Sequence, residues 1–111
     1  MTRIQNVLRP FGITKCYKGF HRVCFSIHLA IVDDSRLEAV TKEIYMETAS
    51  HFGCDWTAVE RNIRTAVARA WRVNPNLLIH MAGYPLDGMP SASEFIEIIS
   101  SHILRSTKSQ P

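Results

Sequence analysis

The chain has 111 residues, of which 46% are hydrophobic and 21% charged, and its formal net charge is +3. These values predict one globular domain spanning 1–111 with a modest core, and they permit nucleic-acid binding without requiring it. No apolar run approaches the roughly 20 residues of a membrane-spanning helix, and the N-terminus lacks the apolar segment of a signal peptide. We therefore expect a cytoplasmic protein that does not bind membranes.

The first two predicted helices cover residues 2–11 and 18–32. In the first, Thr2 is a suitable N-cap and Pro10 is expected to end or kink the helix. Gly12 stops this helix, and 13–17 is predicted to be a linker. The second helix is the most apolar segment of the chain, so we expect it at the centre of the core.

Three residues of the second helix raise the question of a metal site. His21, Cys24 and His28 share helical spacing, but a usual zinc site needs four ligands, often in close pairs, and no second pair lies nearby. We expect packing or surface roles and no metal or other cofactor. The chain's three cysteines are odd in number and lack CxxC spacing, which indicates reduced thiols.

A turn at 33–35, in which Ser35 is a possible cap, leads through a segment from Arg36 into a helix over 41–52. In this helix, the residues expected to point inward are Ile44, Ala49 and Phe52. Gly53 permits the left-handed backbone that ends a helix, and the turn from 53 to 56 has the length of a helix-turn-helix.

The helix expected over about 56–72 has two different faces. One face is apolar at helical spacing and is formed by Val59, Ile63, Ala66, Val67 and Ala70. The opposite face carries Thr57, Arg61, Arg64, Thr65, Ala68 and Arg72. Asp55 is the expected N-cap, with a competing capping box from Thr57 to Glu60. Such a helix suits the major groove of DNA, although a plain helical hairpin with a solvated basic face has the same pattern.

The remaining chain is predicted to form two further helices. Asn74 and Pro75 begin a short helix over 76–81 that Gly83 ends. A loop follows over 85–90, and Ser91 with Glu94 forms a capping box that opens the last helix. The polar tail over 106–111 is predicted to be disordered.

Five separate segments resemble the effector domain of the stage zero sporulation protein A family. The run VERNIRTAVARAW over 59–71 resembles that family's V-E-R-x-I-R-x-A-I-x-x-A-W. KGF at 18–20 resembles K-G-Y, and TKEIY at 41–45 resembles T-K-x-L-Y. The segment 79–84 ends in the family's Gly-Tyr, and PSASEFI at 90–96 is similar to P-T-N-S-E-F-I. Their common order along nearly the whole chain makes chance similarity a poor explanation.

The resemblance implies an all-α domain of about six helices around a helix-turn-helix. It implies a transcription regulator of sporulation that binds a short DNA box of the TGTCGAA type, with base readout by Glu60, Arg61 and Arg64. The chemistry agrees, because an arginine fork can hold guanine O6 and N7 together, and a glutamate can accept from cytosine N4 or position an arginine. Arg61 and Arg64, three residues apart, are expected to be neighbours on the outward face.

Other residues are expected to support DNA binding without reading sequence. Phosphate or supporting contacts are assigned to Thr57, Thr65, Lys42, Arg69 and Arg72. Ala58 stands where the family has an arginine, and Thr65 where it has a histidine. We therefore expect a related but not necessarily identical DNA site, or weaker binding.

The short helix over 76–81 corresponds in the resembled family to a surface that contacts the sigma subunit of RNA polymerase. The corresponding residues are Leu78, His80 and Ala82, although Ala82 replaces the family's phenylalanine. A short packing helix is the other interpretation of the same segment.

Two alternatives to DNA binding remain at this point. Enzymatic activity is disfavoured because no Ser, Cys or His lies in a recognisable catalytic setting, so we expect no enzyme. A protein-interaction module that kept the fold and lost specific DNA binding would fit the altered Ala58, Thr65 and Ala82, but the retained arginines argue against it. The family's regulators carry an N-terminal receiver domain, so this is expected to be either an excised effector domain or a receiver-less protein. Binding as a dimer or in tandem on DNA is expected in both cases.

Overall fold

The computed structural model describes residues 2–108, and within this range the chain is built from helices without strands. The six α-helices are α1 (Thr2–Leu8), α2 (Phe20–Val32), α3 (Met46–Phe52), α4 (Trp56–Val73), α5 (Pro75–Ala82) and α6 (Ala92–Lys108). Three shorter segments are η1 (Arg9–Phe11) and η2 (Asp34–Ala39), which are 3-10 turns, and η3 (Thr41–Tyr45), which is a π-helical turn. The predicted all-α class is confirmed.

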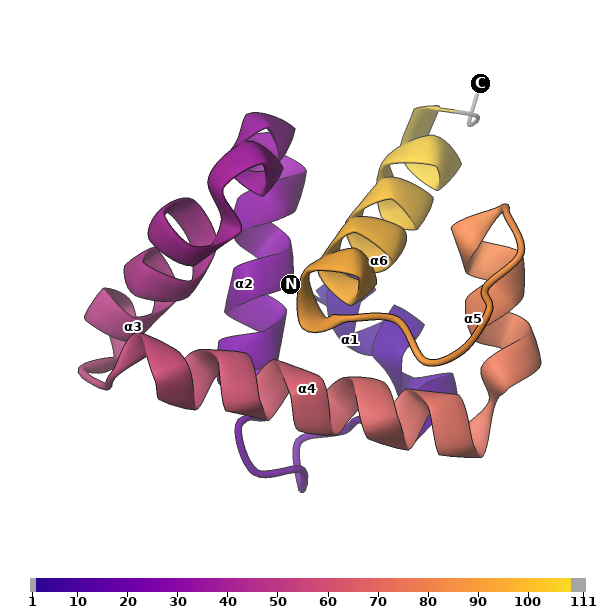
Figure 1. Cartoon of the computed structure of the whole chain (residues 1–111), viewed down its shortest axis with the longest axis horizontal. Coiled ribbons are helices and arrows are strands. Elements are labelled where there is room, and N and C mark those ends of the chain that lie inside the picture. Colours follow the sequence, from indigo (N-terminus) through magenta and orange to yellow (C-terminus); the bar gives the residue numbers. More distant parts are fainter. Residues whose placement is uncertain (1, 109–111) are drawn as a thin grey trace.

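The core forms where α2 packs against α6, a pairing more extensive than any other between helices in the described range. Val23 and Ile27 of α2 and Phe95 and Ile99 of α6 are completely buried. The long helix α4 runs across one end of this pair (Figure 1). The α4 side chains buried against the core are Val59, Ile63, Ala66, Val67 and Ala70, as the periodicity predicted.

The helix-turn-helix consists of α3, a turn over 53–55 and α4. Gly53 has φ +67° and ψ +41°, the left-handed conformation predicted for it, and the Cys54 N–H donates to the Ala49 carbonyl at 3.0 Å. Helix α4 begins at Trp56, so Asp55 occupies the N-cap position and the competing start at Thr57 is wrong. The Asp55 carboxylate accepts from the Thr57 hydroxyl rather than from a backbone N–H.

Two further helix starts follow the sequence prediction closely. The Asn74 side chain accepts from the Leu77 N–H at 3.3 Å. At the start of α6, the Glu94 N–H donates to the Ser91 hydroxyl at 3.2 Å, and the Ser91 N–H donates to the Glu94 carboxylate at 3.0 Å. These reciprocal bonds are the predicted capping box, which satisfies backbone donors that a helix leaves unpaired.

The helix predicted over 41–52 differs from expectation in two respects. Its first turn is the π-helical η3, where Arg36 Nη1 donates to the Glu43 carbonyl at 2.7 Å and draws η2 against it. Phe52, predicted to point inward, is 37% exposed. Phe52 is the last residue of α3, so its ring lies at the edge of the interface between α2 and α3, where it packs edge-on against Phe25 of α2.

The predictions for the first helix, for the cap at Ser35 and for the C-terminal tail also need correction. Helix α1 stops at Leu8, and Pro10 lies in the 3-10 turn that follows. Ser35 does not cap η2; its N–H donates to the Asp33 side chain at 3.1 Å. Helix α6 continues to Lys108, through the first part of the tail predicted to be disordered from 106. Residues 109–111 of that tail lie outside the described residues. No helix within 2–108 is long and apolar enough to cross a membrane.

Candidate nucleic-acid interface

Helix α4 is buried along one side and exposed along the other. Thr57, Arg61, Arg64, Thr65 and Arg72 are all exposed, whereas the apolar stripe is completely or almost completely buried. The division of faces predicted from the spacing is therefore confirmed. An anchored helix that presents polar and cationic groups to solvent has the form of a major-groove reader.

Glu60 and Arg64 form an ion pair on this exposed side. Arg64 Nε lies 3.2 Å from Glu60 Oε1, with the two side chains 62% and 35% exposed, respectively. Burial raises the pKa of nearby Tyr45 to about 12, and the charge of Glu60 adds to this increase while Arg64 opposes it. The Tyr45 ring is parallel to that of Trp56, at 6.5 Å between centroids. The ion pair thus lies near the packed rings of Tyr45 and Trp56, and Glu60 holds the Arg64 guanidinium in a defined direction.

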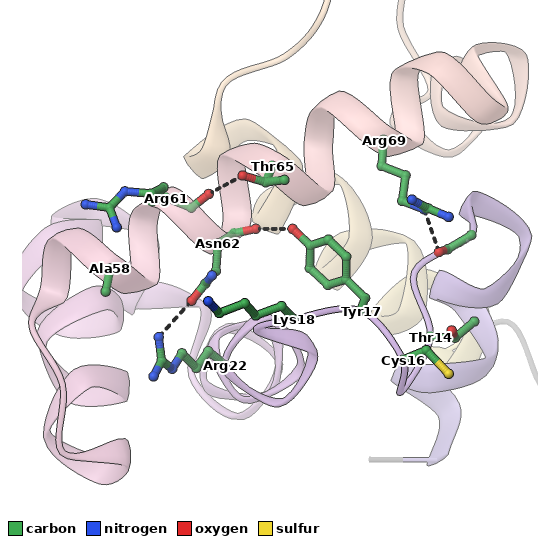
Figure 2. Close-up of a pocket in the computed structure, with 11 residues that line it drawn as sticks. Thr14, Cys16, Tyr17, Lys18, Arg22, Ala58, Arg61, Asn62, Thr65 and Arg69 are labelled. Carbon is green, nitrogen blue, oxygen red and sulfur yellow. Dashed lines mark hydrogen bonds between the residues drawn. The ribbon is translucent and has the colours of Figure 1, made fainter.

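Arg61 lies in a different environment from Arg64, although the two were predicted to be neighbours. Arg61 lines a groove between α4 and the loop over 12–19, and its side chain extends outward from α4 (Figure 2). Arg64 and Glu60 line a second hollow, which also borders Thr41 and Ser91. Within residues 2–108, the Arg61 guanidinium has no hydrogen-bond or ion-pair partner. All of its donors are consequently available to a ligand.

The groove beside Arg61, here called the cationic groove, has a volume of about 690 Å³. Its charged lining residues are Lys18, Arg22, Arg61 and Arg69. Among the described residues no aspartate or glutamate lines it. This arrangement favours a polyanion.

Asn62, a residue of α4 that lines the cationic groove, binds Tyr17 of the loop over 12–19 and Arg22 of α2. The Tyr17 hydroxyl donates to the Asn62 carbonyl at 2.8 Å, and Arg22 Nη1 donates to Asn62 Oδ1 at 3.0 Å (Figure 2). Burial raises the pKa of Tyr17, while Thr65 and Arg69 lower it. Arg69 Nε donates to the Gly12 carbonyl at 2.7 Å, so one donor of this predicted phosphate ligand already has a partner.

Sequence reasoning placed a plain linker at 13–17 and did not single out Asn62, Tyr17, Lys18 or Arg22 as functional residues. Two signals were available: Asn62 is a polar residue inside the α4 motif, and Lys18 lies in the KGF match at 18–20. The contacts themselves leave no local pattern, because they join residues 40 to 57 positions apart. The other predicted phosphate ligands, Lys42 and Arg72, are exposed and do not line the cationic groove.

The three residues of α5 proposed to contact polymerase are placed differently from one another. Leu78 is completely buried and Ala82 is 9% exposed, so both belong to the core. The buried side of α5 faces α4 and α6, so the Leu78 side chain offers no surface to a partner, whereas a contact through Ala82 stays a prediction. Only His80 of the three is exposed.

The residues considered as metal ligands on α2 do not share one environment. His21 is exposed, whereas Cys24 is completely buried, and this burial raises the pKa of the Cys24 thiol to about 11. Within 2–108, no group of three His, Cys, Asp or Glu side chains is arranged to hold a metal ion.

The family comparison agrees with the exposed cationic helix. The sequence model of the family described as "Sporulation initiation factor Spo0A C terminal" matches residues 4–103. The matched segment contains the cationic groove, the whole helix-turn-helix and most of α6. Domains of this family bind DNA and are not a class of enzyme. The chain therefore belongs to the Spo0A C-terminal domain family, the DNA-binding effector domains of a sporulation regulator.

Proposed function

We propose that the chain is a sequence-specific transcription regulator of the sporulation-initiation type, acting in the cytoplasm. In this proposal α4 lies in the major groove of double-stranded DNA and reads a TGTCGAA-like box. The observation that carries it is the exposed face of α4, where Arg61, whose guanidinium has no partner within 2–108, lies between the two residues of the Glu60–Arg64 ion pair in the sequence.

The three side chains are suited to different parts of base readout. The Arg61 guanidinium can donate two parallel bonds to guanine O6 and N7. Arg64 presents a second fork, and the ion pair with Glu60 restricts its direction before DNA binds. Glu60 keeps acceptor capacity for cytosine N4 because a carboxylate accepts several hydrogen bonds. Thr57 and Thr65 lie on the same exposed face and support contacts to the DNA backbone.

Fluorescence anisotropy tests base readout directly. The chain is titrated against a TGTCGAA-type duplex and a scrambled duplex, with Arg61→Ala, Arg64→Ala and the remote control Arg3→Ala. Each α4 variant is expected to lose about 1–3 kcal/mol of preference for the box, whereas the control keeps the preference. Equal binding of the parent chain to both duplexes would overturn the proposal. Absence of binding to either duplex would favour a protein-interaction module with this fold.

We also propose that the chain binds repeated boxes in tandem, because one helix inserted in one groove makes a small interface. Equilibrium sedimentation with one-box and two-box duplexes measures the affinity per box. Higher affinity per box on the two-box duplex supports tandem binding, and equal affinity excludes it. A contact with the polymerase sigma subunit would fall on the exposed His80 of α5.

A further inference from the structure

The two hollows that flank the exposed face of α4 differ in charge. The cationic groove presents Lys18, Arg22 and Arg61, with no carboxylate among its described lining residues. The hollow on the other side contains Glu38, Glu60 and Glu94 around Arg64. A phosphodiester chain is attracted to the first side and repelled from much of the second, so the charge difference favours one lateral placement of a duplex on α4.

The cationic groove is held in shape by Asn62. Its carbonyl and side chain bind Tyr17 and Arg22, which precede and begin α2. Gly19 has φ +86°, and a Cβ atom there would lie 2.5 Å from Asn62 Cγ. The backbone therefore touches Asn62 directly, and this close approach brings the neighbouring Lys18 alongside α4. A site already held in this way loses less conformational entropy when a ligand binds.

The three cations also have donors left for phosphate oxygens. Arg22 has five N–H donors, and the bond to Asn62 Oδ1 uses one of them. Lys18 is exposed, and Arg61 has no side-chain partner within 2–108. Guanidinium and ammonium groups form their strongest hydrogen bonds with anionic oxygens.

We propose that the cationic groove grips the sugar–phosphate backbone of the DNA duplex that α4 reads. Lys18 and Arg22 are phosphate ligands from outside the helix-turn-helix, Arg61 spans the groove rim and the bases, and Asn62 is a positioning residue. The inference rests on the proposed DNA-binding function of α4. It adds a second contact element, formed by the loop over 12–19 and the start of α2.

A salt series tests the phosphate contacts. The parent, Lys18→Gln, Arg22→Gln and the control Arg3→Gln, which removes the same charge outside the groove, are titrated with box and scrambled duplexes. Each groove variant is expected to reduce the slope of log K against log salt by about 0.9 and affinity on the order of tenfold at 0.1 M salt. The loss should be equal on both duplexes, and the control should keep the parent slope.

The positioning role of Asn62 needs a different measurement, because Asn62→Ala removes no charge. The Asn62→Ala variant should bind both duplexes more weakly than the parent, yet have no further effect in an Arg22→Gln background. Urea unfolding of each variant checks that the fold is retained. Additive losses in this double-mutant cycle would overturn the positioning role.

The outcomes separate this inference from base readout. If the salt slopes of Lys18→Gln and Arg22→Gln equal that of the control, the groove does not hold phosphate, even if Arg61→Ala still reduces preference for the box. If the slopes fall while the parent shows no preference for the box, the groove inference holds and base readout by α4 is wrong.

Discussion

Arg64 Nε lies 3.2 Å from the carboxylate of Glu60, one helical turn earlier on the exposed side of α4. Glutamate placed before arginine at this spacing agrees with the direction of the helix dipole. Because the pair is substantially exposed, its effect on the unfolding free energy is small. The ion pair instead limits the orientations of the Arg64 guanidinium, which faces solvent.

Replacing Glu60 by glutamine should separate stability from recognition. We expect the free energy of unfolding of Glu60→Gln to change by less than about 0.5 kcal/mol, while discrimination between box and scrambled duplexes falls. Urea unfolding and fluorescence anisotropy measure the two quantities on the same sample. A large loss of stability with unchanged discrimination would instead assign Glu60 a structural role.

The hydroxyls of Ser26 and Thr48 form a buried hydrogen bond of 3.0 Å between α2 and α3. Thr48→Val removes this partner while the Ser26 hydroxyl keeps its bond to the Arg22 carbonyl at 2.9 Å, so we expect destabilisation of about 0.5–1.5 kcal/mol. The double variant with Ser26→Ala should cost less than the sum of the single changes, because both polar groups are then removed together. Urea unfolding provides the four values, and simple additivity would show that the hydroxyls are not coupled.

Two glycines in left-handed backbone offer a matched comparison. A Cβ atom at Gly53 would meet no atom within 4 Å, so Gly53→Ala should cost only the conformational term of about 1–2 kcal/mol. At Gly19 the same atom would also lie 2.5 Å from Asn62 Cγ. Gly19→Ala should therefore be more destabilising in thermal or urea unfolding. Equal costs would mean that the backbone near Asn62 moves freely.

His102 should make stability depend on mildly acidic pH. Its pKa is lowered by burial, then by the charges of Arg105, His80 and Arg3. The unfolded chain therefore binds a proton more readily than the folded chain, and stability should decrease as pH falls through the ordinary histidine pKa of about 6.5. Urea unfolding of the parent and His102→Gln at pH 7.5 and 5.5 measures this effect. The variant should lose less stability on acidification, and equal losses would contradict the assignment.

The fold was predictable where local chemistry determines it. Asn74, the Ser91–Glu94 capping box and Gly53 each fix a helix end through bonds or backbone angles within a few residues. The buried stripe of α4 follows from spacing alone. Features set by distant partners were missed, since the outward position of Phe52 depends on where α2 crosses α3.

The candidate site divides in the same way. The exposure of Arg61 and Arg64 followed from helical geometry, and the resemblance added base readout, which stays a prediction. Their separation into different hollows was not predictable, because the loop over 12–19 lines the hollow beside Arg61, whereas the segments around Thr41 and Ser91 line the hollow beside Arg64. Leu78 was misassigned to a contact surface because a family correspondence does not state which side of a short helix is buried.

The attachment of the loop over 12–19 to α4 has a consequence for folding. Its bonds to α4 join residues separated by 45 and 57 positions, so the loop acquires its shape only after α4 has docked on the core. Amide hydrogens of the loop should thus become protected from exchange late during refolding. An unfolded or nascent chain carries the same positive charges without the groove that assembles them.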